Sequence, residues 1–136
     1  MEIRRGIKKK HTISLIISGL ATSFIYILGG WDIALQMLLL VIGLDYITGI
    51  CRAIHDKRLN SKLGLKGILK KIGYLILVAL SVIIDRITGG AGAIRTLVIY
   101  FFVANEGLSI IENWGSMGLP LPQKLIDTLE QLKNEE

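Results

Sequence analysis

The chain has 136 residues, enough for one domain; Ala, Val, Ile, Leu, Met, Phe, Trp, Tyr and Cys make up 51% of them, and there are 15 glycines in addition. Only 20% are charged and the mean hydropathy is +0.56, which excludes a disordered chain, while the single cysteine, Cys51, excludes a disulfide scaffold. A small membrane protein or an unusually apolar oligomer remains, and the net charge of +5 comes mainly from two basic blocks that flank apolar runs.

Four apolar runs follow one another along the chain, and about 20 such residues cross the hydrocarbon core of a bilayer. Polar residues interrupt the second run at Asp45 and the fourth at Arg95, Asn105 and Glu106. The third uncharged stretch, 72–84, is short and needs flanking residues at the interfaces to cross. We therefore predict an all-α integral membrane protein of one domain, residues 1–136, with three spans as the alternative. The predicted spans are 12–30, 33–51, 68–88 and 93–112.

The distribution of Lys and Arg predicts the orientation, because cytoplasmic loops of membrane proteins carry an excess of these residues. With four spans and the N-terminus inside, 14 of the 16 lie on the cytoplasmic side, and only Arg86 and Arg95 lie outside. Both termini are therefore expected in the cytoplasm. The first run follows a basic segment as a signal peptide does, but no A-x-A-like cleavage site follows it, so we expect an uncleaved span. Turns are predicted at 29–32 and 89–92.

The segment 60–71, NSKLGLKGILKK, joins the second and third runs. Asn60 or Ser61 can cap a helix start there. The segment is expected to lie on the cytoplasmic leaflet as a helix whose lysines contact anionic headgroups, or to be a basic loop that only determines topology. The candidate headgroup-contact residues recur every four residues and are Lys62, Lys66 and Lys70.

Polar side chains inside apolar runs are costly in a membrane and are therefore functional candidates. In the second run Asp45 is followed at helical spacing by Thr48 and Arg52, and in the fourth a polar stripe runs from Asn105 to Glu112. These faces either line a wet cavity between subunits, carry protons or ions, lie near the interfaces, or pair within one bundle. The candidate pore-facing or helix-packing residues are Asp45, Thr48, Asn105, Glu106 and Ser109.

The first run carries small residues at four-residue spacing, which permits close approach of helices and hence a homo-oligomer. The candidate helix-contact residues are Ser14, Ser18, Gly19 and Ser23. Beyond the fourth run, segment 120–134 is predicted to be an amphipathic cytoplasmic helix that packs on a neighbouring subunit, on the membrane or in solvent. Its apolar stripe consists of Leu121, Leu125, Ile126, Leu129 and Leu132.

Enzymatic chemistry has little support in this sequence. His11 and His55 lie far apart, Cys51 has no second cysteine, and no phosphate-binding glycine loop is present. We therefore expect no catalytic residue, metal or cofactor. Nucleic acid is not an expected partner either, because the basic residues follow membrane topology and lack interleaved aromatic residues.

Three segments resemble the phage holin family that includes clostridial toxin-secretion holins: 45–49 (DYITG), 61–72 (SKLGLKGILKKI) and 104–125 (ANEGLSIIENWGSMGLPLPQKL). The last segment is the most specific. The resemblance implies a small protein of the bacterial cytoplasmic membrane that oligomerises and opens non-selective lesions at a set time. These lesions release a phage endolysin, which need not bind the protein, or in some clostridia a toxin, and the host lyses.

Two other functions remain open from the residues alone. A small ion channel or transporter subunit would use Asp45 and Glu106 as ion ligands. A non-porous membrane adaptor would recruit a cytoplasmic partner through the helix predicted at 120–134.

Overall fold

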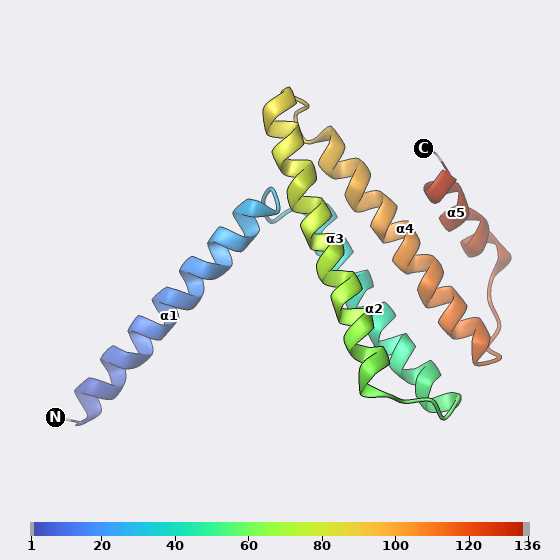
Figure 1. Ribbon diagram of the computed structural model, residues 1–136, viewed down its shortest axis with the longest axis horizontal. Helices are drawn as coiled ribbons and strands as arrows, with labels where there is room; N and C mark the ends of the chain where they lie inside the picture. The colour runs from blue at the N-terminus through green and yellow to red at the C-terminus, as the bar shows by residue number, and fades with distance from the viewer. Residues whose placement is uncertain (1, 135–136) are drawn as a thin grey trace.

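The computed structural model describes residues 2–134, which form five α-helices joined by short turns, without a strand among them. Helices α2, α3 and α4 lie side by side as an antiparallel bundle, α1 diverges from it, and α5 lies beside α4 (Figure 1). The predicted all-α class is therefore confirmed. The helices are α1 (Glu2–Ile27), α2 (Ile33–His55), α3 (Ser61–Thr88), α4 (Ala93–Ser116) and α5 (Gln123–Asn134).

Helices α1 to α4 are each long and apolar enough to cross a membrane. Many large apolar side chains point outward from them, as Leu40, Ile76 and Leu97 do with exposed fractions of 53%, 62% and 52%. A helix satisfies its backbone hydrogen bonds internally, so such a surface is stable against lipid and unfavourable against water. The fold is that of a multi-pass membrane protein.

The core of the bundle lies between α2, α3 and α4. Leu38, Val78 and Ile99, one from each helix, are 0% exposed. Tyr74 of α3 stacks on Phe102 of α4 with ring centroids 4.1 Å apart. Because lipid tails are as apolar as these side chains, close van der Waals packing rather than release from water holds the helices together in a membrane.

The helix ends follow local sequence signals. Asp32 caps α2 by accepting a hydrogen bond from the Leu35 backbone N–H at 2.9 Å. Asn60 caps α3 by accepting from the Lys62 N–H, as predicted. Gly89 ends α3 with a φ of +70°, a left-handed conformation that glycine adopts without strain. The predicted turns at 29–32 and 89–92 are therefore present.

Helix α3 differs from its prediction. It is one continuous helix of 28 residues, whereas the sequence suggested a surface helix or a basic loop in 60–71 and a span from 68. Lys71 turns into the bundle and finds partners there, while three lysines of the first turns remain on the outside. Residues 61–71 are therefore the beginning of α3, and headgroup contact stays a prediction for the exposed lysines Lys62, Lys66 and Lys70.

Helix α1 meets the bundle at its C-terminal end, where the Arg86 guanidinium of α3 lies 4.4 Å from the centre of the Tyr26 ring. The remainder of α1 projects away (Figure 1). Its predicted helix-contact residues are exposed in the described chain, so their role in an oligomer stays a prediction. These residues are Ser14, Ser18, Gly19 and Ser23.

Helix α5 begins at Gln123, whereas the predicted segment 120–134 begins three residues earlier. Pro120 and Pro122 lie in the connection before the first helical turn. It folds back onto α4. The indole N–H of Trp114 donates to the Pro120 carbonyl oxygen at 3.3 Å. In the predicted apolar stripe, the side chains of Leu129 and Leu132 lie outside the described residues.

Candidate functional site

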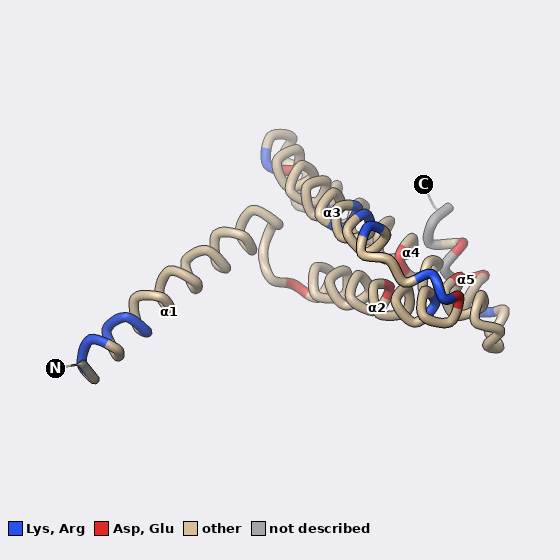
Figure 2. Tube along the Cα trace, turned by 60° about the horizontal axis from the view of Figure 1, so that its bottom comes forward, with Lys and Arg blue, Asp and Glu red and all other residues tan. Residues whose placement is uncertain are grey.

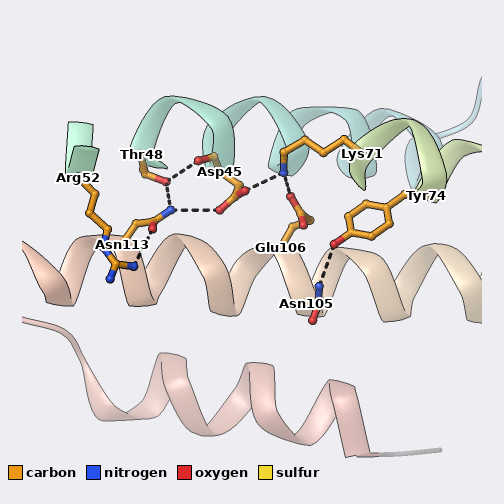
Figure 3. Close-up of polar contacts among 8 residues, drawn as sticks. All are labelled: Asp45, Thr48, Arg52, Lys71, Tyr74, Asn105, Glu106 and Asn113. Atoms are coloured by element: carbon orange, nitrogen blue, oxygen red, sulfur yellow. Dashed lines mark hydrogen bonds and ion pairs between the residues drawn. The ribbon is translucent and has the colours of Figure 1, made fainter. Parts of the chain in front are cut away.

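A lysine from α3 reaches between α2 and α4 and pairs with two carboxylates. The Lys71 Nζ lies 2.7 Å from Asp45 Oδ2 and also contacts Glu106 Oε2 (Figure 3). The exposed fractions of these side chains are 12% for Lys71, 14% for Asp45 and 1% for Glu106. Charges removed from water need such partners, particularly at membrane depth. One ammonium group therefore links three helices.

Asn113 of α4 extends this cluster toward the C-terminal end of α2. Its Nδ2 donates to Asp45 Oδ1 and to Thr48 Oγ1, both at 3.2 Å, and its Oδ1 accepts from Arg52 Nη1 at 3.4 Å. The two carboxylates and the two cations balance in charge. We refer to the connected side chains as the polar network: Asp45, Thr48, Arg52, Lys71, Glu106 and Asn113 (Figure 3).

Asn105 lies on a different side of α4 from its neighbour Glu106. Its Nδ2 donates to the Tyr74 hydroxyl of α3 at 3.2 Å. Ser109 is half-buried on the same helix, and its side chain makes no hydrogen bond within the described residues. Asn105 therefore joins α4 to α3 without entering the polar network.

The structure thus brings Asp45, Thr48 and Glu106 together and leaves the other polar candidates apart. The stripe predicted from Asn105 to Glu112 does not face α2, and Glu112 is exposed. The polar residues of α4 that contact Asp45 and Lys71 are Glu106 and Asn113, seven residues apart, and a pore-facing role of the other candidates stays a prediction.

Lys71 and Asn113 were missed by the sequence reasoning. In the sequence, Lys71 is one of several basic residues that precede the third apolar run. A signal was available, because Lys70 and Lys71 are adjacent and so cannot share one face of a helix. Asn113 lies two helical turns after Glu106 and on its face, which is also readable from the sequence.

A second polar cluster, centred on the buried Arg95, lies at the opposite end of the bundle, where the turns before α2 and α4 meet. The Arg95 guanidinium donates to the carbonyl oxygens of Leu28 and Gly30 at 2.6 and 3.2 Å. It also donates to both carboxylate oxygens of Asp32, at 2.6 and 3.1 Å. Arg95 therefore fastens the turn after α1 to the first turn of α4.

Asp85 of α3 lies at the same end of the bundle and contacts the first turn of α4. Its carboxylate accepts from the backbone N–H groups of Ile94 and Arg95, at 3.1 and 2.8 Å. These are donors that the first turn of a helix leaves unpaired. We refer to Asp32, Asp85 and Arg95 as the Arg95 clasp; the sequence had suggested only a turn and an outer-side charge at these positions.

Replacing Gly29 by alanine is expected to destabilise the bundle more than the same change at Gly30. Both residues have a positive φ, +87° and +108°, which costs about 1–3 kcal/mol for a residue with a Cβ. A Cβ at Gly29 would also lie 2.5 Å from the Arg95 Nε, whereas a Cβ at Gly30 meets nothing within 4 Å. Denaturation in mild detergent micelles measures the free energy of unfolding of both variants. Equal losses of stability would contradict the close approach of Gly29 to Arg95.

Acid is expected to weaken the Arg95 clasp. The hydrogen-bonded Arg95 guanidinium lowers the pKa of Asp32 below its usual 3.8. A carboxyl with a lowered pKa stabilises the fold fully above its unfolded pKa and loses this contribution as the pH falls through the folded pKa. The effect is small because Asp32 is half-exposed. Stability measured from pH 6 to pH 2 should fall less in Asp32→Asn than in the wild type below about pH 4.

A model of the bacteriophage holin family matches residues 22–134, which include the bundle, both polar clusters and α5. The chain belongs to the bacteriophage holin family. The resemblance inferred from segments 45–49, 61–72 and 104–125 is therefore confirmed. No solved structure matches the chain.

Relatives of this holin-family protein occur in Clostridium and Listeria species. A 14.9 kDa protein from the nagH 3′ region of Clostridium perfringens is 44% identical over 121 residues, 88% of this chain and 92% of that one. Clostridium acetobutylicum has a relative 38% identical over 123 residues, 90% and 98% of the two chains. A Listeria monocytogenes relative is 42% identical over 109 residues, 80% and 78%. All three are described as uncharacterized, so they support the family and no particular activity.

Proposed function

We propose that this holin-family protein acts as a holin. It accumulates in the bacterial cytoplasmic membrane, oligomerises and opens non-selective lesions through which an endolysin reaches the cell wall. Family membership and four membrane-length helices support this proposal. The observation that carries it is the polar network, which brings charged and amide side chains of three membrane-length helices together inside a bundle that exposes many large apolar side chains.

The polar network suits a protein with two states. In the single chain its groups satisfy one another, so the closed bundle is tolerated in lipid. When several chains associate and their bundles open, the same groups face water and form a hydrophilic wall. A wall with both carboxylates and cations has little charge selectivity, as a lesion for a folded enzyme requires. No bond is broken in the process, and the endolysin need not touch the protein.

The proposed orientation has both termini in the cytoplasm. Basic residues gather at the N-terminal end of α1 and around the connection between α2 and α3 (Figure 2). Anionic headgroups and the positive-inside rule favour these regions on the cytoplasmic side.

Single cysteines test the orientation in a Cys51→Ser background. Trp31 and Ala91 lie in the two turns at one end, while Leu59 and Leu119 lie in the connections at the other end, and all four are exposed. A membrane-impermeant thiol reagent should label positions 31 and 91 on intact cells and positions 59 and 119 only after permeabilisation. The opposite pattern, or a mixed one, would contradict the four-span topology.

The activity is tested by expression in a bacterium with and without an endolysin active on its cell wall. We expect abrupt loss of membrane potential at a reproducible time in both cultures, followed by lysis only where the endolysin is present. Continued growth with the full-length protein in the membrane contradicts the proposal.

Liposomes separate a holin from the other candidate functions. A holin releases large dextrans without ion selectivity, whereas a channel or transporter that uses Asp45 and Glu106 gives saturable, selective ion flux. An adaptor leaves the liposomes intact, and its role depends on residues 120–136.

A further inference from the structure

We infer that the polar network holds α2, α3 and α4 together and so determines how readily the bundle opens, and that this closure depends on Lys71. We refer to this role of the network as the lock. The inference rests on the proposed function, because opening of the bundle is taken as the step that forms the lesion. It assigns the timing of that step to one ion-paired lysine.

The position of Lys71 in the fold is the first argument. Its two carboxylate partners lie on α2 and α4, so its ammonium group links all three helices of the bundle (Figure 3). Helix α2 packs extensively on α4, and α3 packs on α4, whereas α2 and α3 touch each other at few residues. The pair between Lys71 and Asp45 is therefore a main connection between α2 and α3.

Charge balance is the second argument. Asp45 and Glu106 contact the same ammonium nitrogen, so the two carboxylates lie close together, and Glu106 is 1% exposed. Without Lys71 two neighbouring carboxylates at membrane depth would repel each other and lack their counterion. Removing one partner of a buried ion pair is strongly unfavourable. Admission of water between the helices relieves this penalty, so loss of Lys71 favours the open state.

Arg52, the other cation of the network, does not substitute for Lys71. Its side chain is 43% exposed and also pairs with Asp56 at 3.7 Å. Its contact with the network is one hydrogen bond of 3.4 Å to Asn113. Arg52 therefore lies at the solvent-exposed end of the network, and the carboxylates at the buried end depend on Lys71 for their counterion.

The test compares Lys71→Met with wild type and with Lys57→Met. Lys57 is exposed in the connection between α2 and α3, so the control removes the same charge outside the network. Purified proteins are added to liposomes at increasing protein-to-lipid ratio, and dextran release is recorded. Lys71→Met should release dextran at a several-fold lower ratio and shorten the time to lysis in cells. A threshold equal to or above that of wild type and Lys57→Met would overturn the inference.

A triple variant tests the charge argument in the reverse direction. Asp45→Asn, Lys71→Met and Glu106→Gln together leave the buried end neutral again. The threshold should return toward the wild-type value, because no uncompensated carboxylate remains. If the triple variant opens as early as Lys71→Met, the lock does not work by charge balance and the inference fails.

Distance measurements separate the lock from the proposed function. Spin labels at Ile54 of α2 and Leu63 of α3, both exposed, report the separation of these helices in a Cys51→Ser background. Below the release threshold, wild type and Lys57→Met should give one narrow distance, and Lys71→Met a longer and broader one. If wild type never releases dextran, the proposed function fails while this distance still tests the lock. An unchanged distance in Lys71→Met overturns the lock itself.

Discussion

Replacement of Arg95 by methionine should destabilise the folded bundle by about 3 kcal/mol, because buried and half-buried carbonyl groups and a half-exposed carboxylate lose their donor at once. The carbonyl oxygens of Leu28 and Gly30 and the carboxylate of Asp32 all accept from this guanidinium. Methionine preserves most of the aliphatic packing and removes the hydrogen bonds. The direction in which α1 leaves the bundle should also become less defined, since these bonds fasten the turn after it.

Arg86→Met is the matched control for this prediction. Arg86 is exposed, contacts the Tyr26 ring and donates one hydrogen bond of 3.2 Å to the Tyr26 carbonyl oxygen. Its loss should cost about 1 kcal/mol or less. Denaturant titration in detergent micelles, followed by tryptophan fluorescence, measures both variants. Similar losses in the two would show that the Arg95 clasp does not hold the turns together.

The second large effect is expected for Asn113→Leu, with a loss of about 2–4 kcal/mol. Asparagine supplies two donated hydrogen bonds, to Asp45 and Thr48, and accepts one from Arg52. Leucine has a similar size but no polar atoms, so the groups around it are left without a partner. Because the network would be incomplete, dextran release should also begin at a lower protein-to-lipid ratio than in wild type.

Asn105→Leu distinguishes the network from amide groups in general. Asn105 is on the same helix and donates one hydrogen bond, to the Tyr74 hydroxyl. Its replacement should cost about 1 kcal/mol and leave the release threshold close to the wild-type value. If the two asparagine variants lose the same stability and have the same release threshold, the place of Asn113 in the polar network does not explain its effect.

Asp45 and Glu106 show how far sequence reasoning can reach into the site. A carboxylate inside an apolar run is costly wherever it lies in a membrane, so both were identifiable without a structure. Their partner was not identified, because Lys71 stands among lysines that serve as orientation signals. Which lysine of a basic stripe turns inward depends on the helix packed beside it, and α4 supplies that surface only in the folded bundle.

Asp32 and Arg95 illustrate the same difference at the other end. The sequence indicated a turn at 29–32 and a charge that interrupts the fourth run. It gave no sign that Asp32 and Arg95, which are 63 positions apart, would form a bidentate ion pair. Such a contact depends on the antiparallel order of the helices, which brings the turn before α2 beside the first turn of α4.

The sequence by itself determined that the protein belongs in a membrane, that it is helical, and which family it resembles. These depend on local properties: the length of apolar runs, the caps and glycines at their ends, the side on which basic residues gather, and the recognisable segment 104–125. Only the tertiary structure decided that α2, α3 and α4 form a bundle without α1, and which polar groups meet inside it. The reason is physical: in lipid the apolar faces of helices differ little in energy, so pairing depends on side-chain shape and on the mutual satisfaction of a few buried charges.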